Sequence, residues 1–249
     1  MSVKSKLGWL LSKLLYEWNP IKHRRKQKFY ANFIGNGDLC FDVGSHLGDR
    51  ADTWLRLNAR VVAFEPQPNF ADYLSQKFAA NTQFNLERVG LGEAPGNATL
   101  AISTLFPTLS TLAGNDWEKE LTAASNLRIE FDKKITIETS TLDAMIQKYG
   151  TPHFCKIDVE GFELQVLKGL SVALPYISFE FLSFSETRMQ ECLDVLKSLG
   201  YKHFNWSYKE TFQMRFDHWV DDHQVVNDIK QFKKGIFSGD IYCRFDSCK

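Results

Sequence analysis

The chain has 249 residues, with 30 basic and 30 acidic side chains and 44% apolar residues, which is typical of a globular protein rather than a disordered or fibrous one. Its net charge of zero excludes the basic surface that nucleic-acid binding needs, so no nucleic-acid partner is predicted. No apolar run reaches the roughly 18 residues of a membrane span, and five cysteines without a CxxC pair are predicted to be reduced, as in a cytoplasmic protein.

The N-terminal part of the chain, residues 1–34, is predicted to be a basic helical segment that precedes one domain at 35–249. Its first 30 residues hold eight bases and one acid (+7), whereas the remainder holds 22 bases and 29 acids (−7). Leucines and a tryptophan at three- and four-residue steps over 7–18 predict a helix with one apolar face. We expect residues 4–28 to dock on the protein itself or on a partner; peripheral binding to the inner face of a membrane is the alternative.

From residue 38 onward, short apolar runs alternate with longer amphipathic stretches, which predicts a parallel sheet covered by helices. Strands are predicted at 39–43, 60–64, 83–89, 153–157 and 177–181, and helices at 48–58, 69–80, 141–149, 162–170 and 186–199. Ser and Thr between apolar residues over 97–138 predict an inserted antiparallel pair of strands joined by a polar loop. The aromatic residues of 204–219 are predicted to be core, with a lid over a substrate as the alternative.

Two turns at the ends of predicted strands have the residues of a nucleoside site. Gly44 and Gly48 permit a tight strand-to-helix turn and a close approach of the backbone to a ligand. Glu65 lies 21 positions after Gly44, near the offset at which an acid accepts hydrogen bonds from ribose hydroxyls. Because ligands of parallel sheets bind at the carboxyl ends of the strands, these turns predict a ligand that contains a nucleoside.

The charges beside the first turn distinguish between nucleosides. The turn lacks two of the three glycines that let a helix hold a pyrophosphate, and Asp42 and Asp49 flank it. Carboxylates there would repel phosphates and attract a positively charged adenosyl group. These residues favour S-adenosylmethionine and methyl transfer. A NAD-dependent oxidoreductase and a non-catalytic S-adenosylmethionine-binding module are the alternatives.

The densest polar turn follows the predicted strand at 153–157. Asp158 and Glu160 are predicted to point to one side of the strand tip, where Asp158 would orient a substrate hydroxyl. His46 ranks next as the general base, and Glu160 and Glu180 are further candidates. A Mg²⁺ ion on the three carboxylates is weakly indicated, so no metal is predicted.

Five blocks of the sequence occur together in a known family. They are Asp42-Val43-Gly44-Ser45-His46-Leu47-Gly48, Phe64-Glu65-Pro66, Thr141-Leu142-Asp143, Lys156-Ile157-Asp158-Val159-Glu160-Gly161-Phe162-Glu163 and Val166-Leu167-Lys168-Gly169. With these blocks, residues 38 to 182 resemble the FkbM family of S-adenosylmethionine-dependent methyltransferases. The resemblance implies a class I methyltransferase (Rossmann-like) three-layer α/β fold with a mixed sheet of about seven strands, the last of them antiparallel. It also implies O-methylation of a hydroxyl on a sugar, a glycan or a polyketide-like small molecule. By position, the resemblance assigns cofactor binding to Asp42, Gly44, Ser45, Gly48, Glu65 and Asp158.

Overall fold

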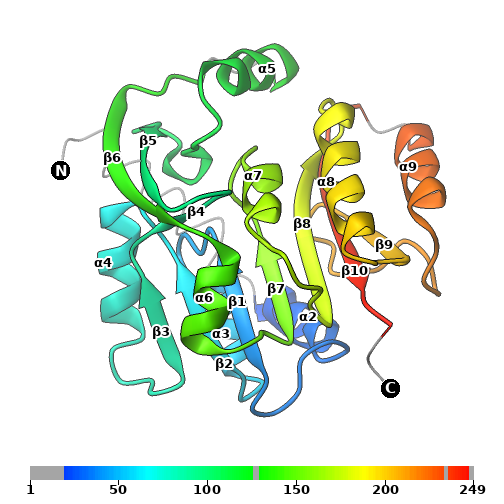
Figure 1. Ribbon diagram of the computed structural model, residues 1–249, viewed down its shortest axis with the longest axis horizontal. Helices are drawn as coiled ribbons and strands as arrows, with labels where there is room; N and C mark the ends of the chain where they lie inside the picture. The colour runs from blue at the N-terminus through cyan, green and yellow to red at the C-terminus, as the bar shows by residue number, and fades with distance from the viewer. Residues whose placement is uncertain (1–19, 126–128, 233–234, 247–249) are drawn as a thin grey trace.

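A seven-stranded mixed sheet with helices against both faces forms the centre of the protein (Figure 1). The computed structural model describes residues 20–125, 129–232 and 235–246. The strands, in spatial order, are β3 (Phe84–Glu87), β2 (Arg60–Phe64), β1 (Leu39–Val43), β7 (Phe154–Ile157), β8 (Tyr176–Leu182), β10 (Ser238–Arg244) and β9 (His203–Tyr208). Within this sheet β10 is antiparallel to both of its neighbours, and the remaining pairs are parallel. The expected mixed sheet is therefore confirmed.

Helices cover the sheet on both sides because its central strands are apolar toward both faces. In β1, Phe41 belongs to one apolar cluster and Cys40 to the other. One face is covered by α2 (Pro20–Tyr30), α3 (Asp49–Leu55) and α4 (Pro68–Lys77), and the other by α6 (Leu142–Tyr149), α7 (Glu163–Lys168), α8 (Glu186–Ser198) and α9 (Asp222–Gln231). The predicted parallel strands and their helices are all present, and only their ends differ by a few residues.

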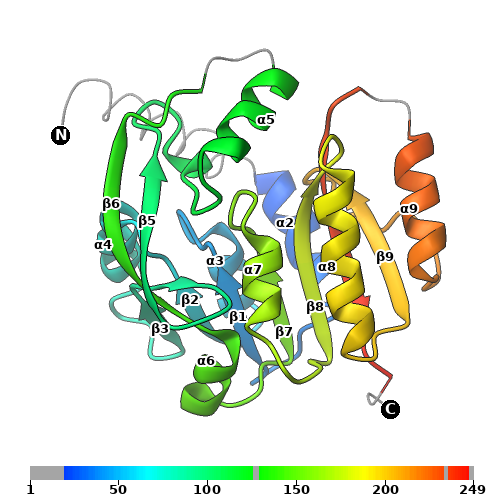
Figure 2. The same ribbon diagram turned by 45° about the horizontal axis from the view of Figure 1, so that its top comes forward.

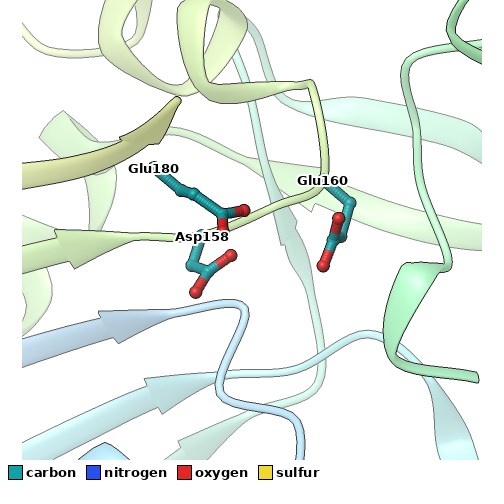
Figure 3. A group of neighbouring side chains, drawn as sticks. All are labelled: Asp158, Glu160 and Glu180. Atoms are coloured by element: carbon teal, nitrogen blue, oxygen red, sulfur yellow. The ribbon is translucent and has the colours of Figure 1, made fainter. Parts of the chain in front are cut away.

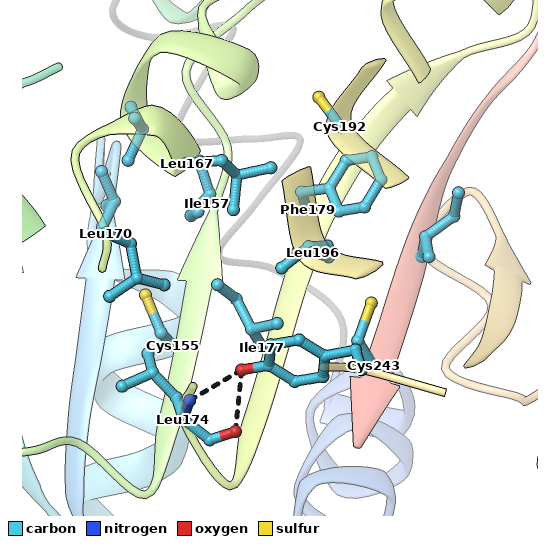
Figure 4. Close-up of a cluster of buried hydrophobic side chains, with 14 of the residues drawn as sticks. Cys155, Ile157, Leu167, Leu170, Leu174, Ile177, Phe179, Cys192, Leu196 and Cys243 are labelled. Atoms are coloured by element: carbon cyan, nitrogen blue, oxygen red, sulfur yellow. Dashed lines mark hydrogen bonds between the residues drawn. The ribbon is translucent and has the colours of Figure 1, made fainter. Parts of the chain in front are cut away.

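The larger apolar cluster lies between β7, β8 and the helices α7 and α8 (Figure 4). Ile157 and Ile177 of the strands and Leu167 of α7 are fully buried there. The Tyr201 hydroxyl donates to the Leu174 carbonyl and accepts from the Leu174 N–H, each at 2.8 Å. Full burial of one such aliphatic side chain contributes about 1.5–3 kcal/mol, so this layer fixes the strand ends that carry the polar turns.

Between β3 and α6 the chain builds a second, smaller sheet beyond the carboxyl ends of the parallel strands (Figure 2). It consists of β4 (Gly90–Leu91), β6 (Lys133–Ser140) and β5 (Gly96–Ile102), with η1 (Pro107–Leu109) and α5 (Asn115–Ser125) between β5 and β6. β5 and β6 are antiparallel, which confirms the inserted pair. The predicted polar loop is wrong, because α5 buries Trp117 against α8, where the Arg188 guanidinium lies 4.7 Å from the ring centroid.

The described part of the N-terminal segment packs on the sheet. Phe29, Tyr30 and Phe33, at and beyond the end of α2, are buried in the second apolar cluster, and the buried Lys26 forms an ion pair with Asp49 of α3. The helix predicted over 7–18 lies outside the described residues. Among the residues that the structure describes, no helix is long and apolar enough to cross a membrane.

Two smaller predictions concern cysteines and aromatic residues. Cys40, Cys155, Cys192 and Cys243 are free and buried, as expected of reduced thiols, whereas the fifth cysteine lies outside the described part. Of the aromatic residues of 204–219, Phe204 and Trp206 of β9 are buried, as predicted for core residues. Tyr208, at the end of β9, is half-buried and lines a cavity.

Candidate active site

The turn after β1 fits tightly against the end of β7. Gly44 has φ +81°, and a Cβ atom there would lie 1.9 Å from the Asp158 carbonyl oxygen. Gly48, with φ +69°, begins α3, and a Cβ there would lie 2.6 Å from the Leu74 side chain. Only glycine satisfies both the backbone conformation and the space, so both turn glycines are required for the strand tips to meet.

Asp42, within β1, is a buried acid with one free oxygen. It is 1% exposed, and its Oδ2 accepts a 2.7 Å hydrogen bond from the Ser45 hydroxyl. Its Oδ1 has no hydrogen-bond partner among the described residues. Burial raises the pKa of Asp42, although Arg50 and Ser45 offset part of the effect. A buried unpaired carboxylate oxygen at a strand tip is the kind of group that a bound ligand satisfies.

Glu65, directly after β2, is held in place by backbone donors. Its two carboxylate oxygens accept hydrogen bonds from the N–H groups of His46 (2.8 Å) and Gln67 (2.9 Å). Burial raises the pKa of Glu65 to about 7, although the two N–H groups oppose the shift. This carboxyl therefore changes its charge near neutral pH, and its position beside the Gly44 turn is the predicted one.

Asp158, at the end of β7, is ionised and paired. Its N–H donates to the Val43 carbonyl at 2.9 Å, and its Oδ2 accepts from Arg50 at 2.5 Å. Burial alone would raise the pKa of Asp158, but the cations Arg50 and Lys156 outweigh it and hold that pKa below its usual range. Asp158 thus carries a stable negative charge in the crevice.

His46 lies in the first turn with a left-handed backbone (φ +47°). Burial lowers the pKa of His46 to about 4; the charge of Asp158 opposes this shift and that of Arg50 adds to it. The imidazole is therefore neutral at physiological pH and binds a proton weakly.

Three carboxyl groups lie close together (Figure 3): those of Asp158 and Glu160, which follow β7, and that of Glu180, within the neighbouring strand β8. Each offers one oxygen, and these oxygens lie within 4.8 Å of one another. The extended chain expected from Asp158 to Glu160 is wrong, since Glu160 has φ +54° and the backbone turns there, yet the carboxyls still meet. Burial and the charge of Asp158 raise the pKa values of Glu160 and Glu180 well above their ordinary range.

Arg50, Lys156 and Asp240 complete the site, and the sequence analysis did not assign them a role there. Lys156 is fully buried, and its Nζ donates to Asp240 Oδ1 on β10 at 2.6 Å. The Tyr242 hydroxyl donates to Asp240 Oδ2 at 3.2 Å. The negative pocket expected from Asp42 and Asp49 is partly neutralised, because Asp49 pairs with Lys26. Arg50 and Lys156 supply positive charge beside the carboxyl cluster.

Two cavities open along these strand tips and share His46 and Asp158. The wider cavity has a volume of about 480 Å³ and a strongly polar lining; the narrow slot has about 40 Å³ and lies over Glu65. The slot is lined by apolar side chains of the main domain and of the insertion, among them Phe64, Phe70, Leu91, Leu100, Pro107 and Leu112. The wider cavity is lined among others by Arg50, Glu160, Glu180, Tyr208, Lys209 and Asp240. Such a pair of adjoining sites suits the transfer of a group between two molecules.

The strand order, the glycine turn after β1 and the acid after β2 define a class I methyltransferase fold. The profile of the methyltransferase FkbM domain matches residues 42–203. The chain belongs to the FkbM methyltransferase family, whose methyl donor is S-adenosylmethionine.

Known proteins with similar sequences are methyltransferases by name. The hexuronic acid methyltransferase AglP of Haloferax volcanii is 33% identical over 146 residues, which cover 57% of this chain and 54% of AglP. The methyltransferase sdnD of Sordaria araneosa is 29% identical over 133 residues, which cover 45% of this chain and 51% of sdnD. The chain therefore spans about half the length of the curated relatives it matches.

Solved structures with a similar overall path include a TehB-like S-adenosylmethionine-dependent methyltransferase from Corynebacterium glutamicum, with a TM-score of 0.48 and 12% identity over 97% of both chains. Fibrillarin from Aeropyrum pernix has a TM-score of 0.47 and 9% identity over 89% of this chain and 75% of its own.

Proposed function

We propose that this protein transfers the methyl group of S-adenosylmethionine to a hydroxyl oxygen of a sugar-type small molecule or glycan. The observation that carries the proposal is the pair of cavities that meet at His46 and Asp158. The family membership supports methyl transfer, and the name of the relative AglP supports a sugar acceptor.

The donor is proposed to bind across the junction of the two cavities, with its nucleoside part at the narrow slot, because a slot of about 40 Å³ is too small to hold the whole molecule. Glu65 would accept hydrogen bonds from the ribose hydroxyls, and Gly44 and Gly48 would let the turn approach the donor. The free oxygen of Asp42, oriented by Ser45, and the charge of Asp158 would face the methionine part. Bound there, the donor supplies a methyl group on a positively charged sulfur, which the negative crevice stabilises.

The wider cavity is the proposed acceptor site. Its volume of about 480 Å³ lies in the range of small-molecule sites, and its polar lining suits a molecule with many hydroxyl groups. Asp158, at its junction with the donor slot, would orient the attacking hydroxyl, and His46 is the proton acceptor that the sequence favours. A protein that only binds S-adenosylmethionine would need no second cavity of this kind.

The test is mass spectrometry of a panel of glycosides, uronic acids and polyketide alcohols incubated with the enzyme and S-adenosylmethionine. We expect an acceptor to gain the mass of one CH₂ unit and S-adenosylhomocysteine to form in equal amount. The Glu65→Gln variant should lose this activity at limiting donor, whereas Glu186→Gln on the exposed start of α8 should retain it. Donor binding without turnover of any acceptor would instead favour the non-catalytic binding module. A preference for NAD over S-adenosylmethionine would favour the oxidoreductase.

We further propose that the protein is cytoplasmic and that residues 4–28 dock it on an acidic surface. On α2 the side chains of Arg24, Arg25 and Lys28 are exposed, and no carboxylate pairs with them within the described ranges. Anionic vesicles should bind the full chain more strongly than a chain without residues 1–19 carrying Arg24→Glu and Arg25→Glu. If neither chain bound the vesicles at any salt concentration, the docking surface would instead be a partner protein.

A further inference from the structure

Four groups of the wider cavity could accept the proton that the attacking hydroxyl loses: His46, Asp158, Glu160 and Glu180. An efficient base has a pKa near the operating pH, because it must be free of its proton beforehand and still bind one well. The pKa values of Asp158 and His46 both lie below this range. The contact with Arg50 lowers that of Asp158, and burial lowers that of His46. These two residues are better suited to position the acceptor than to hold its proton.

Glu180 has the most firmly fixed position of the remaining two. It lies within β8, which is paired with β7 on one side and with β10 on the other, and it is the register partner of Asp240. Glu160 lies in a left-handed turn outside the sheet, where its carbonyl accepts a 2.6 Å hydrogen bond from Thr111 of the insertion. A base held by a central strand keeps its geometry better than one on a turn.

Glu180 also has a direct connection to Asp158. The two carboxyls face each other, with oxygens that lie within 4.8 Å (Figure 3). A hydrogen bond from a protonated Glu180 to the ionised Asp158 lowers the pKa of Asp158. A proton taken up by Glu180 is therefore stabilised at once by the neighbouring charge.

We infer that Glu180 is the catalytic base of the methyl transfer and that Asp158, held by Arg50, positions the acceptor and shares the proton that Glu180 receives. This inference rests on the proposed function. The acceptor oxygen forms a bond to the methyl carbon, the carbon–sulfur bond breaks with its electron pair left on sulfur, and the hydroxyl proton moves to a Glu180 carboxylate oxygen. Glu180 then returns the proton to water.

Donor binding prepares the base. Burial and the surrounding negative charges raise the pKa of Glu180 well above its ordinary range, which favours its protonated form. A positively charged sulfur beside the same cluster would favour the ionised carboxylate, so Glu180 would release a proton when the donor binds. The charged or titratable groups that surround Glu180 or line the cavities beside it are Lys156, Asp158, Glu160, Glu163, Asp240, Arg50, His46, Asp49, Tyr208, Lys209, Glu210, Arg188 and Cys192.

The first test needs no acceptor. Calorimetry of S-adenosylmethionine and S-adenosylhomocysteine binding, in buffers of different ionisation enthalpy, counts the protons released by each. Both ligands have the same ribose, so Glu65 contributes equally, and the difference isolates the sulfonium charge. We expect the wild-type protein to release more protons with S-adenosylmethionine, and Glu180→Gln to abolish this difference while Glu160→Gln retains part of it. An unchanged difference in Glu180→Gln would overturn the inference, even if no acceptor were found.

The second test uses the acceptor that the mass spectrometry identifies. The wild-type kcat should rise with pH as Glu180 loses its proton, and Glu180→Gln should lower kcat about 10²- to 10⁴-fold and remove that rise. Donor affinity and melting temperature serve as controls for folding. A Glu180→Gln enzyme with wild-type kcat and pH profile contradicts the inference but leaves the methyltransferase intact, whereas a wild-type protein without turnover contradicts the proposed function alone.

Discussion

At the scale of single residues, Gly44 determines whether the β1 and β7 ends can meet. Its positive φ disfavours a side chain, and a Cβ atom there would lie only 1.9 Å from the Asp158 carbonyl oxygen. Gly37 offers a matched control, since it has nearly the same φ (+82°) but no atom within 4 Å of the place that a Cβ would take. The two glycines therefore separate the effect of backbone conformation from that of contact.

We predict that Gly37→Ala lowers the free energy of unfolding by about 1–2 kcal/mol, the usual difference for an alanine in a left-handed conformation. Gly44→Ala should lose at least about 2 kcal/mol more, because the strand tips must move apart to admit the methyl group. Urea unfolding of both variants measures the difference. Equal losses would mean that the β1–β7 contact can relax without cost.

The proposed ribose contact of Glu65 would make donor binding depend on pH. Its pKa is about 7 in the free protein, and hydrogen bonds from the ribose hydroxyls would favour the ionised form and lower the pKa in the complex. Binding would then release a proton below pH 7. We predict that affinity for S-adenosylhomocysteine falls as the pH drops below about 7, by at most about tenfold per unit, and is level above it.

The check is calorimetric titration of S-adenosylhomocysteine between about pH 5.5 and 8.5, a range that brackets that pKa of about 7. Glu65→Gln should bind more weakly at the alkaline end and show a flatter curve. A wild-type affinity that does not change with pH would argue against Glu65 as the ribose contact.

At the scale of elements, the antiparallel strand β10 supplies the acid that neutralises a buried cation. Lys156 on β7 reaches past β8 to Asp240 on β10, so the ion pair links strands that are not neighbours. Removal of one member leaves the other charge buried and uncompensated, which is the costly case. The pair therefore helps to hold β7 and β10 together, and it fixes Asp240 in the wall of the wider cavity.

We predict that Lys156→Met lowers the free energy of unfolding by about 3–5 kcal/mol. The double variant Lys156→Met/Asp240→Leu should recover most of this loss, since no lone charge remains. Guanidinium unfolding of the single and double variants tests the coupling. Additive losses would show that the two side chains do not compensate each other.

The same elements show what the sequence reveals and what it does not. β1 and β2 have the predicted ends because each is a short apolar run closed by a polar turn. Helix α5 is not predicted because its short stretch lies between segments rich in Ser and Thr, and it is anchored by Trp117, whose Arg188 partner lies far along the chain. Arg50 and Asp240 are not predicted as site residues because no local pattern encodes the register that brings them to Asp158 and Lys156.

At the scale of the whole molecule, the insertion between β3 and α6 forms one wall of the proposed donor slot. Leu100, Pro107 and Leu112 line the slot, and Thr111 bonds to the Glu160 carbonyl. Trp117 anchors α5 to α8 at a distance from the slot. The insertion is therefore attached at two points to the domain whose site it covers.

We predict that Trp117→Ala weakens donor binding by about tenfold or more, since loss of a large buried ring loosens the anchor. Far-ultraviolet circular dichroism should retain the signal of the main sheet. Phe84→Ala, on the edge strand β3, is the control, because it removes a ring that packs on Phe78 of the main domain. Unchanged donor affinity in Trp117→Ala would show that the insertion keeps its place beside the slot without this contact of α5.

The wider cavity takes part of its wall from a stretch of the chain that the narrow slot does not use. The slot is built from residues within the 42–203 match, whereas Tyr208, Lys209 and Asp240 of the wider cavity come after it. On the proposed roles, changes in this C-terminal stretch would alter the choice of acceptor and leave donor binding intact. A chimera that exchanges this stretch between two family members should keep its donor and inherit a new acceptor.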